Sequence, residues 1–213
     1  TPAIGHINDD NGDGVVDTDD IPDIVFTTFA SGAYTSPGAL VAISGDGSGM
    51  LWSTTSIGGI RPYGSSGVAI GDLEGDGDVE ICVSGYESAV VCVHGADGSL
   101  LWAGGDDSVY VGAPSIADFD GDGNQDIAVG LPGTGSVALF YDVSSLTGTV
   151  LAEDADVVIS SDGGSGTFGY ALSAGDFDGD GQHDLAVGAP DIIAPIDDGN
   201  GTTSFIEMIF EEG

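Results

Sequence analysis

Four short segments of the sequence place carboxylate or amide side chains at alternating positions and end in a further acid. Within each segment these side chains stand at positions 1, 3 and 5, a glycine at position 6, and the acid at position 9. The segments are loop one (9–17), loop two (72–80), loop three (118–126) and loop four (176–184). Glycine permits a sharp turn, so the oxygens can converge on one point. Such a set can bind Ca²⁺, which takes about six to eight oxygens.

Each loop is predicted to hold one Ca²⁺, up to four in the chain, through the side chains at positions 1, 3, 5 and 9 and the carbonyl at position 7. For loops two to four the predicted ligands are Asp72, Glu74, Asp76, the Asp78 carbonyl and Glu80; Asp118, Asp120, Asp122, the Asn124 carbonyl and Asp126; and Asp176, Asp178, Asp180, the Gln182 carbonyl and Asp184. Loop two has glutamate at positions 3 and 9, and these longer side chains favour weaker calcium binding there. A single acidic loop is compatible with an ordinary turn, but four copies at the same offsets favour cation sites.

Loop one departs from the other three after its ninth residue. Its predicted ligands are Asp9, Asn11, Asp13, the Val15 carbonyl, Asp17 and Asp20. Six extra residues separate this loop from the strand expected to begin at Asp23, and Asp20 falls at position 12 of an EF-hand-like count. Two interpretations stay open. Either Asp17 and Asp20 complete the site, which we favour, or Asp23 takes the role that Asp126 and Asp184 have in their loops.

Short apolar, β-branched runs flank every loop, and clusters of Gly, Asp, Asn and Ser bound them, which is typical of strands joined by tight turns. In residues 68–104 we expect strands at Val68–Asp72, Glu80–Ser84, Ala89–Val93 and Leu100–Ala103. Four antiparallel strands in about 50 residues is the size of one propeller blade. The loops recur at intervals of 63, 46 and 58 residues, which favours a propeller over a β-solenoid with its shorter turns.

The sequence therefore predicts an all-β chain, a β-propeller of about four four-stranded antiparallel blades. We expect one domain over residues 1–213, with repeats at about 1–60, 61–108, 109–165 and 166–213. The last blade is expected to be incomplete, because Ser204–Phe210 would be its third strand.

Charge excludes two classes of partner. The 213 residues include 36 acids, one arginine and no lysine, for a net charge of −35. A chain without a basic surface is not expected to bind nucleic acid or an anionic membrane, and no apolar run reaches the roughly 18 residues of a membrane span. With 41% hydrophobic residues the chain can still bury a core. We expect no signal peptide in residues 1–20, and the start at Thr1 indicates a processed protein or an excised fragment.

Phe168-Gly169-Tyr170, then loop four, then Gly188-Ala189-Pro190 resembles the FG-GAP repeat of integrin α-chain propellers. Tyr63-Gly64 before loop two and Tyr110-Val111-Gly112 before loop three are similar to the related VCBS repeats of secreted bacterial proteins. The resemblance implies a β-propeller with calcium between the first two strands of a blade, an extracellular or cell-surface location, and a role in adhesion or in binding protein or carbohydrate.

The number of blades departs from the integrin pattern, which has seven. Four loops are consistent with a fragment, a small four-bladed ring, or half of a ring that a second copy completes. Because an open end exposes strand edges, we expect a homodimer.

The function expected from these features is a non-catalytic, calcium-stabilised extracellular module for adhesion or for protein or carbohydrate binding. The alternatives are the propeller portion of a secreted polysaccharide-degrading enzyme, or a self-assembling scaffold. No G-x-S-x-G segment occurs, and the three histidines (His6, His94 and His183) share no spacing. The chain is therefore expected not to be an enzyme.

Cys82 and Cys92 fall on two strands that we expect to pair. The register that places Val83 opposite Val91 also places the two cysteines opposite each other. A cross-strand disulfide and two buried thiols are equally compatible with this pattern, and an exported location favours the disulfide. Trp52 and Trp102 stand at equivalent repeat positions, which favours packing within the blades.

Overall fold

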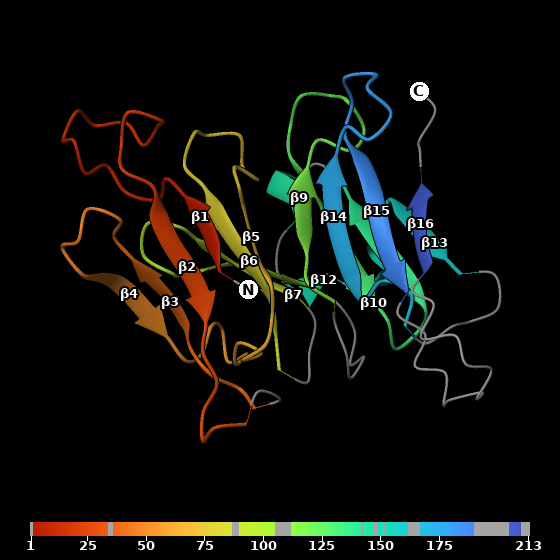
Figure 1. Cartoon of the computed structure of the whole chain (residues 1–213), viewed down its shortest axis with the longest axis horizontal. Coiled ribbons are helices and arrows are strands. Elements are labelled where there is room, and N and C mark those ends of the chain that lie inside the picture. The colour runs from red at the N-terminus through yellow and green to blue at the C-terminus, as the bar shows by residue number, and fades with distance from the viewer. Residues whose placement is uncertain are drawn as a thin grey trace, which may run out of the picture.

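The computed structural model describes residues 2–33, 36–86, 90–104, 112–141, 143–146, 149–150, 152–161, 167–189 and 205–209. Its strands form four sheets that follow one another along the molecule (Figure 1). The all-β class and the four mainly antiparallel sheets agree with the prediction. In the described residues the only helical segments are two 3-10 turns, Val143–Ser145 and Ala152–Asp154, and none of the helices there is long and apolar enough to span a membrane.

Each sheet runs outward in chain order from its first strand. Sheet one contains β1 (Ala3–Gly5), β2 (Asp23–Thr27), β3 (Leu40–Ile43) and β4 (Met50–Thr54). Sheet two contains β5 (Val68–Gly71), β6 (Glu80–Ser84), β7 (Val90–His94) and β8 (Leu100–Gly104). Sheet three contains β9 (Ser115–Ala117), β10 (Asp126–Leu131), β11 (Ser136–Phe140) and β13 (Val157–Ser160), and sheet four contains β14 (Ala171–Gly175), β15 (Asp184–Ala189) and β16 (Phe205–Ile209).

The expected strands of the second repeat are present with shifts of one residue at their ends. The predicted Glu80–Ser84 matches β6 in full, whereas Asp72 lies outside β5 and begins loop two. Ala89 lies outside the described residues. As expected, the described part of sheet four has three strands, with β16 as the third.

Sheet two also has a fifth strand that the repeat pattern did not predict. The two-residue β12 (Thr149–Val150) comes from the third repeat and pairs in parallel with the outer strand β8, Thr149 opposite Ala103. The edge of β8 offers main-chain N–H and C=O groups that another segment can pair with. This pairing links two consecutive repeats.

The apolar core lies between neighbouring sheets in three clusters. The first strands of consecutive sheets contact one another in the order β1, β5, β9 and β14. At each of the first two interfaces a glycine meets a large side chain of the next sheet: a Cβ on Gly5 would lie 3.1 Å from Ile70 Cγ2, and one on Gly71 would lie 2.6 Å from Ile116 Cγ2. Sheets that pack face to face around their first strands form a partial β-propeller.

Cys82 and Cys92 form a disulfide between β6 and β7, with an S–S distance of 2.03 Å. The register is the expected one, with Val83 opposite Val91, so the disulfide and not the pair of free thiols is present. Linking residues this close in sequence removes freedom from the unfolded chain and contributes about 3 kcal/mol. Next to it, the predicted packing role of Trp102 is confirmed, since its ring is buried against Phe140.

Candidate metal centres

All four acidic loops connect the first and second strands of their sheets, and Figure 1 shows them on the same side of the molecule. In each loop the carboxylate at position 1 accepts hydrogen bonds from the N–H groups at positions 4 and 6. In loop three Gly121 donates to Asp118 Oδ1 at 2.7 Å and Gly123 to Asp118 Oδ2 at 3.0 Å. The matching bonds run from Gly12 and Gly14 to Asp9, from Gly75 and Gly77 to Asp72, and from Gly179 and Gly181 to Asp176.

These glycines adopt a backbone conformation that side chains disfavour. All eight have φ between 70° and 96°, in the left-handed region where glycine carries no steric penalty. The N–H at position 7 then donates to the carboxylate at position 5 in every loop: Val15 to Asp13, Asp78 to Asp76, Asn124 to Asp122 and Gln182 to Asp180. The four loops thus share one hydrogen-bonded turn, and this turn accounts for the regular spacing of acids and glycines in the sequence.

The turn brings the predicted ligands together. Carboxylate oxygens of Asp118, Asp120 and Asp122 lie within 4.8 Å of one another, and the same holds for Asp176, Asp178 and Asp184. Oxygens bound to one Ca²⁺ at about 2.3–2.6 Å lie within about 5 Å of one another. Loops three and four therefore present oxygens at separations suited to a single ion.

The acid at position 9 is the buried end of the site. Glu80, Asp126 and Asp184 are 1%, 1% and 7% exposed, and each accepts a hydrogen bond from the N–H at position 2 of its loop. In loop three the other oxygen, Asp126 Oδ1, is buried without a hydrogen-bond partner. A buried carboxylate without a counter-charge is costly, so this oxygen fits a cation.

Burial changes the acidity of two of these groups. Burial, reinforced by the neighbouring charges of Asp120 and Asp118, raises the pKa of Asp126 to about 6. In loop two, burial together with the charges of Glu74 and Asp76 raises the pKa of Glu80 to about 7. A cation between these carboxylates favours their ionised form.

In loop one the sequence left Asp20 and Asp23 as alternative ligands, and the structure gives these two residues different hydrogen bonds. Asp20 Oδ1 accepts the N–H groups at positions 2 and 3, at 3.0 and 3.1 Å, as Asp126 does in loop three. Asp23 begins β2 in the strand register of Asp126, but its carboxylate accepts the N–H groups of Ile7 and Gly45. The hydrogen bonds therefore favour Asp20 as the end of loop one.

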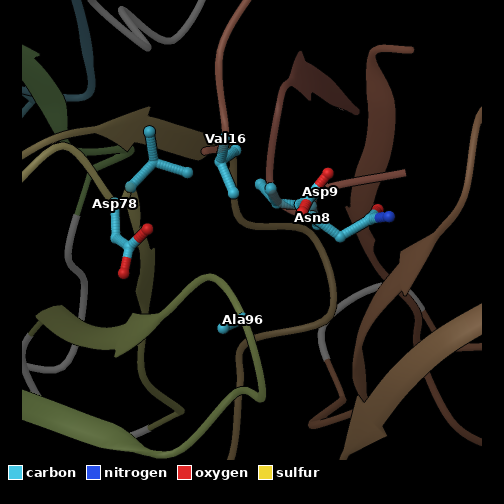
Figure 2. Close-up of a pocket in the computed structure, with 7 residues that line it drawn as sticks. Asn8, Asp9, Val16, Asp78 and Ala96 are labelled. Carbon is cyan, nitrogen blue, oxygen red and sulfur yellow. The ribbon is translucent and has the colours of Figure 1, made fainter. Parts of the chain in front are cut away.

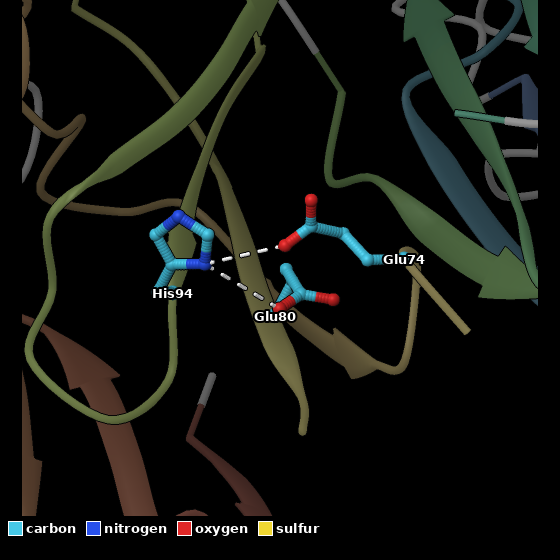
Figure 3. Close-up of side chains that lie close together, drawn as sticks. All are labelled: Glu74, Glu80 and His94. Atoms are coloured by element: carbon cyan, nitrogen blue, oxygen red, sulfur yellow. Dashed lines mark ion pairs between the residues drawn. The ribbon is translucent and has the colours of Figure 1, made fainter. Parts of the chain in front are cut away.

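One residue beside loop two was missed by the sequence reasoning. His94, the last residue of β7, has its Nδ1 atom 3.5 Å from Glu74 Oε2 and 3.8 Å from Glu80 Oε1 (Figure 3). The signal was available, because the register that pairs Val83 with Val91 also pairs Glu80 with His94.

A pocket of about 210 Å³ lies between loop one and the second repeat (Figure 2). Its lining consists of Ile7, Asn8, Asp9, Val16, Asp78, Val79 and Ala96. Asp9 and Asp78 are its only ionisable groups, and the lining has no histidine, serine or cysteine. The lining therefore offers two carboxylates and no hydroxyl, thiol or imidazole group.

Four successive antiparallel sheets, each with an acidic loop between its first two strands, define a repeat protein of the propeller class. Residues 168–203 match the FG-GAP repeat, of which 168–189 lie within the described residues. The chain thus contains an FG-GAP repeat and is similar to integrin-like proteins, as the resemblance in the sequence implied.

Curated relatives match part of the chain. It is 40% identical over 84 residues to a phosphatidylinositol-glycan-specific phospholipase D of Rattus norvegicus, which is 37% of this chain and 10% of the relative. It is 32% identical over 93 residues to integrin alpha-PS2 of Drosophila melanogaster, 39% of this chain and 6% of the relative. The chain thus matches a tenth or less of the length of these relatives. Among solved structures, a Bacillus licheniformis rhamnogalacturonan lyase is similar over 87% of this chain and 40% of its own, with 19% identity and a TM-score of 0.49.

Proposed function

We propose that this chain is a calcium-stabilised, non-catalytic propeller module that is exported from the cell and serves in adhesion or in binding a protein or carbohydrate ligand. The observation that carries the calcium assignment is the shared loop geometry, in which exposed oxygens face a buried carboxylate, as at Asp126 Oδ1. Each ion would join the ends of two strands, so it would act as a structural clamp.

Three observations support the rest of the proposal. The Cys82–Cys92 disulfide is typical of proteins from oxidising compartments, and one relative is an integrin. The excess of acids excludes anionic surfaces as partners. The phospholipase relative supports a variant in which the module belongs to a larger secreted enzyme and binds for it while catalysis resides elsewhere.

The number of bound ions tests the calcium assignment. Metal-free protein is dialysed against Ca²⁺ and the ions are counted by elemental mass spectrometry. We expect three to four Ca²⁺ per chain and one fewer for Asp118→Ala, because the position 1 carboxylate both binds the ion and forms the turn. Fewer than one ion per chain, or equal occupancy by Mg²⁺ at the same concentration, would contradict the assignment.

A second candidate, assembly of two copies, rests on the faces of the two end sheets. On sheet one, Ile4, Ile24 and Ile43 lie side by side across the strands, and Ile4 is 70% exposed. On sheet two the equivalent residues Ile70 and Ile81 lie opposite each other and pack against sheet one. The isoleucine-bearing face that is buried in sheet two is therefore exposed in sheet one.

Sheet four offers the complementary surface. Its outward positions hold small residues, namely Ala171, Ser173, Ala186 and Gly188. At the internal interfaces a large side chain likewise meets a small residue, as Ile70 meets Gly5. We propose that sheet four of a second copy covers the Ile4 face and that the same contact repeats after a two-fold rotation.

Light scattering after size exclusion, at about 100 µM protein in Ca²⁺, tests this assembly. We expect twice the chain mass of 21.1 kDa, and a monomer for Ile4→Ser because the contact loses its most exposed isoleucine. Val158→Ser is the control, since Val158 is 51% exposed on β13 of sheet three. A monomeric mass for the unmodified chain would overturn the proposal.

A further inference from the structure

Loop two departs from the shared turn at one side chain. In the other three loops the N–H at position 5 donates to the side chain at position 3, from Asp13 to Asn11, Asp122 to Asp120 and Asp180 to Asp178. In loop two the Asp76 N–H donates to Asp72 at 3.2 Å, as the Asp13 N–H also does to Asp9, but the bond to the side chain at position 3 is missing. The longer Glu74 carboxylate lies 3.5 Å from His94 Nδ1. Glu74 is thus directed toward β7.

The three side chains converge from three segments of the blade. Glu74 comes from the loop, Glu80 begins β6 and His94 ends β7, and Figure 3 shows both carboxylates directed at the imidazole. One ligand atom from each lies within 4.8 Å of the other two. Glu80 is buried, and about two fifths of the His94 side chain is accessible.

The separations fit a shared ion better than direct hydrogen bonds. The N···O distances of 3.5 and 3.8 Å exceed the roughly 2.9 Å of a hydrogen bond. Ligands held at about 2.0–2.2 Å around a tetrahedral Zn²⁺ lie about 3.3–3.6 Å apart. Small rotations of the partly exposed Glu74 and His94 side chains toward Glu80 would close this difference.

The nitrogen ligand distinguishes this blade from its neighbours. By the same strand register, the position of His94 is held by Ser44 in sheet one and by Tyr141 in sheet three. Ca²⁺ takes oxygen ligands, whereas imidazole suits Zn²⁺, Cu²⁺, Fe²⁺ and Ni²⁺. Two carboxylates and one imidazole leave a fourth position for water, as in many zinc sites.

We propose that Glu74, Glu80 and His94 form a site for a transition-metal dication of the Zn²⁺ class, which loop two binds in preference to Ca²⁺. The proposal rests on the proposed function only in that loop two is a cation site. It assigns loop two a metal different from that of loops three and four. The ion would join the loop to both β6 and β7.

Cobalt spectroscopy on the full chain tests the site, because Co²⁺ replaces Zn²⁺ and absorbs visible light when bound by nitrogen and oxygen. Metal-free protein is first saturated with Ca²⁺ and then titrated with Co²⁺. We expect one equivalent to give a visible band that one equivalent of Zn²⁺ abolishes. His94→Ser, which installs the residue of sheet one, is expected to remove the band and weaken Zn²⁺ binding at least tenfold. His183→Ser, in exposed loop four, is expected to keep both.

A second variant separates metal choice from folding. Glu74→Asp shortens the side chain to the length found in loops three and four, so we expect weaker Zn²⁺ binding and one additional tightly held Ca²⁺. An unchanged cobalt band in His94→Ser, or no Zn²⁺ binding in the presence of Ca²⁺, would overturn the proposal. Loss of Ca²⁺ from loops three and four would instead appear in the ion count and would contradict the proposed function alone.

Discussion

Saturating Ca²⁺ is expected to raise the free energy of unfolding of the metal-free chain by about 10 kcal/mol. An ion that binds only the folded state contributes about 2.7 kcal/mol at one hundred times its Kd, and three to four such sites add to about 8–11 kcal/mol. This equals the net stability of a typical domain, about 5–15 kcal/mol. For a chain of this size the corresponding rise in Tm is about 20–40 °C.

The physical cause is the distribution of charge. The chain carries a net charge of −35, and loops two to four each bring several acids close to one buried carboxylate. Without the ion, repulsion and burial both oppose the folded state. Circular dichroism melts in about 2 mM Ca²⁺ and in excess chelator measure the difference.

Two controls separate specific binding from screening. Added NaCl at matched ionic strength weakens repulsion among exposed charges, and we expect it to recover only a minor part of the rise. Mg²⁺ is expected to do less than Ca²⁺, because it demands a smaller octahedral sphere and keeps its waters. A Tm that is the same in Ca²⁺ and in chelator would show that the loops are ordinary acidic turns.

The loops could be predicted from the sequence because their geometry is local. The position 1 acid, the glycines and the acid at position 5 bond to one another within nine residues, so spacing alone specifies the turn. The strands could be predicted for the same reason, since run length and turn residues define them. The Cys82–Cys92 register followed from the short hairpin between β6 and β7.

Features that depend on distant segments were not predicted. Strand β12 pairs over only two residues with β8 of the preceding repeat, and no periodicity marks so short a pairing. The strand register could have placed His94 opposite Glu80, but the contact between Glu74 and His94 depends on the extra methylene of glutamate, which the repeat pattern does not mark. In the other loops one acid both begins the second strand and accepts the N–H at position 2 of the loop. In loop one two residues divide these roles: Asp23 begins the strand and Asp20 accepts the loop N–H groups.

The effect of Asp126→Asn on the free energy of unfolding is expected to change sign between the metal-free and the Ca²⁺-bound protein. In the metal-free protein, burial raises the pKa of Asp126 to about 6, above its ordinary value of 3.8. The protonated Asp126 side chain therefore contributes fully to the stability of the metal-free protein below about pH 3.8, and this contribution is lost as the pH rises through 6. At pH 7.5 asparagine removes this buried charge and keeps an oxygen for the Phe119 N–H. We expect the metal-free variant to be more stable than the wild type by on the order of 2 kcal/mol.

In Ca²⁺ the same substitution removes an anionic ligand and with it the contribution of one site, about 2.7 kcal/mol at one hundred times its Kd. Because this loss outweighs the metal-free gain of on the order of 2 kcal/mol, the variant is expected to be less stable than the wild type in Ca²⁺ by about 0.7 kcal/mol. Urea unfolding of resin-stripped and Ca²⁺-loaded protein at pH 7.5 and 4.5 measures both effects. The metal-free gain should shrink at pH 4.5, where Asp126 of the wild type is mostly protonated.

Asp46→Asn is the control. Hydrogen bonds from Ser44 and Ser48 lower the pKa of Asp46, which lies outside the four loops. Loss of the Asp46 carboxylate should therefore destabilise both the metal-free and the Ca²⁺-bound protein. Destabilisation of both states by Asp126→Asn would instead show that Asp126 stabilises the turn through hydrogen bonds alone.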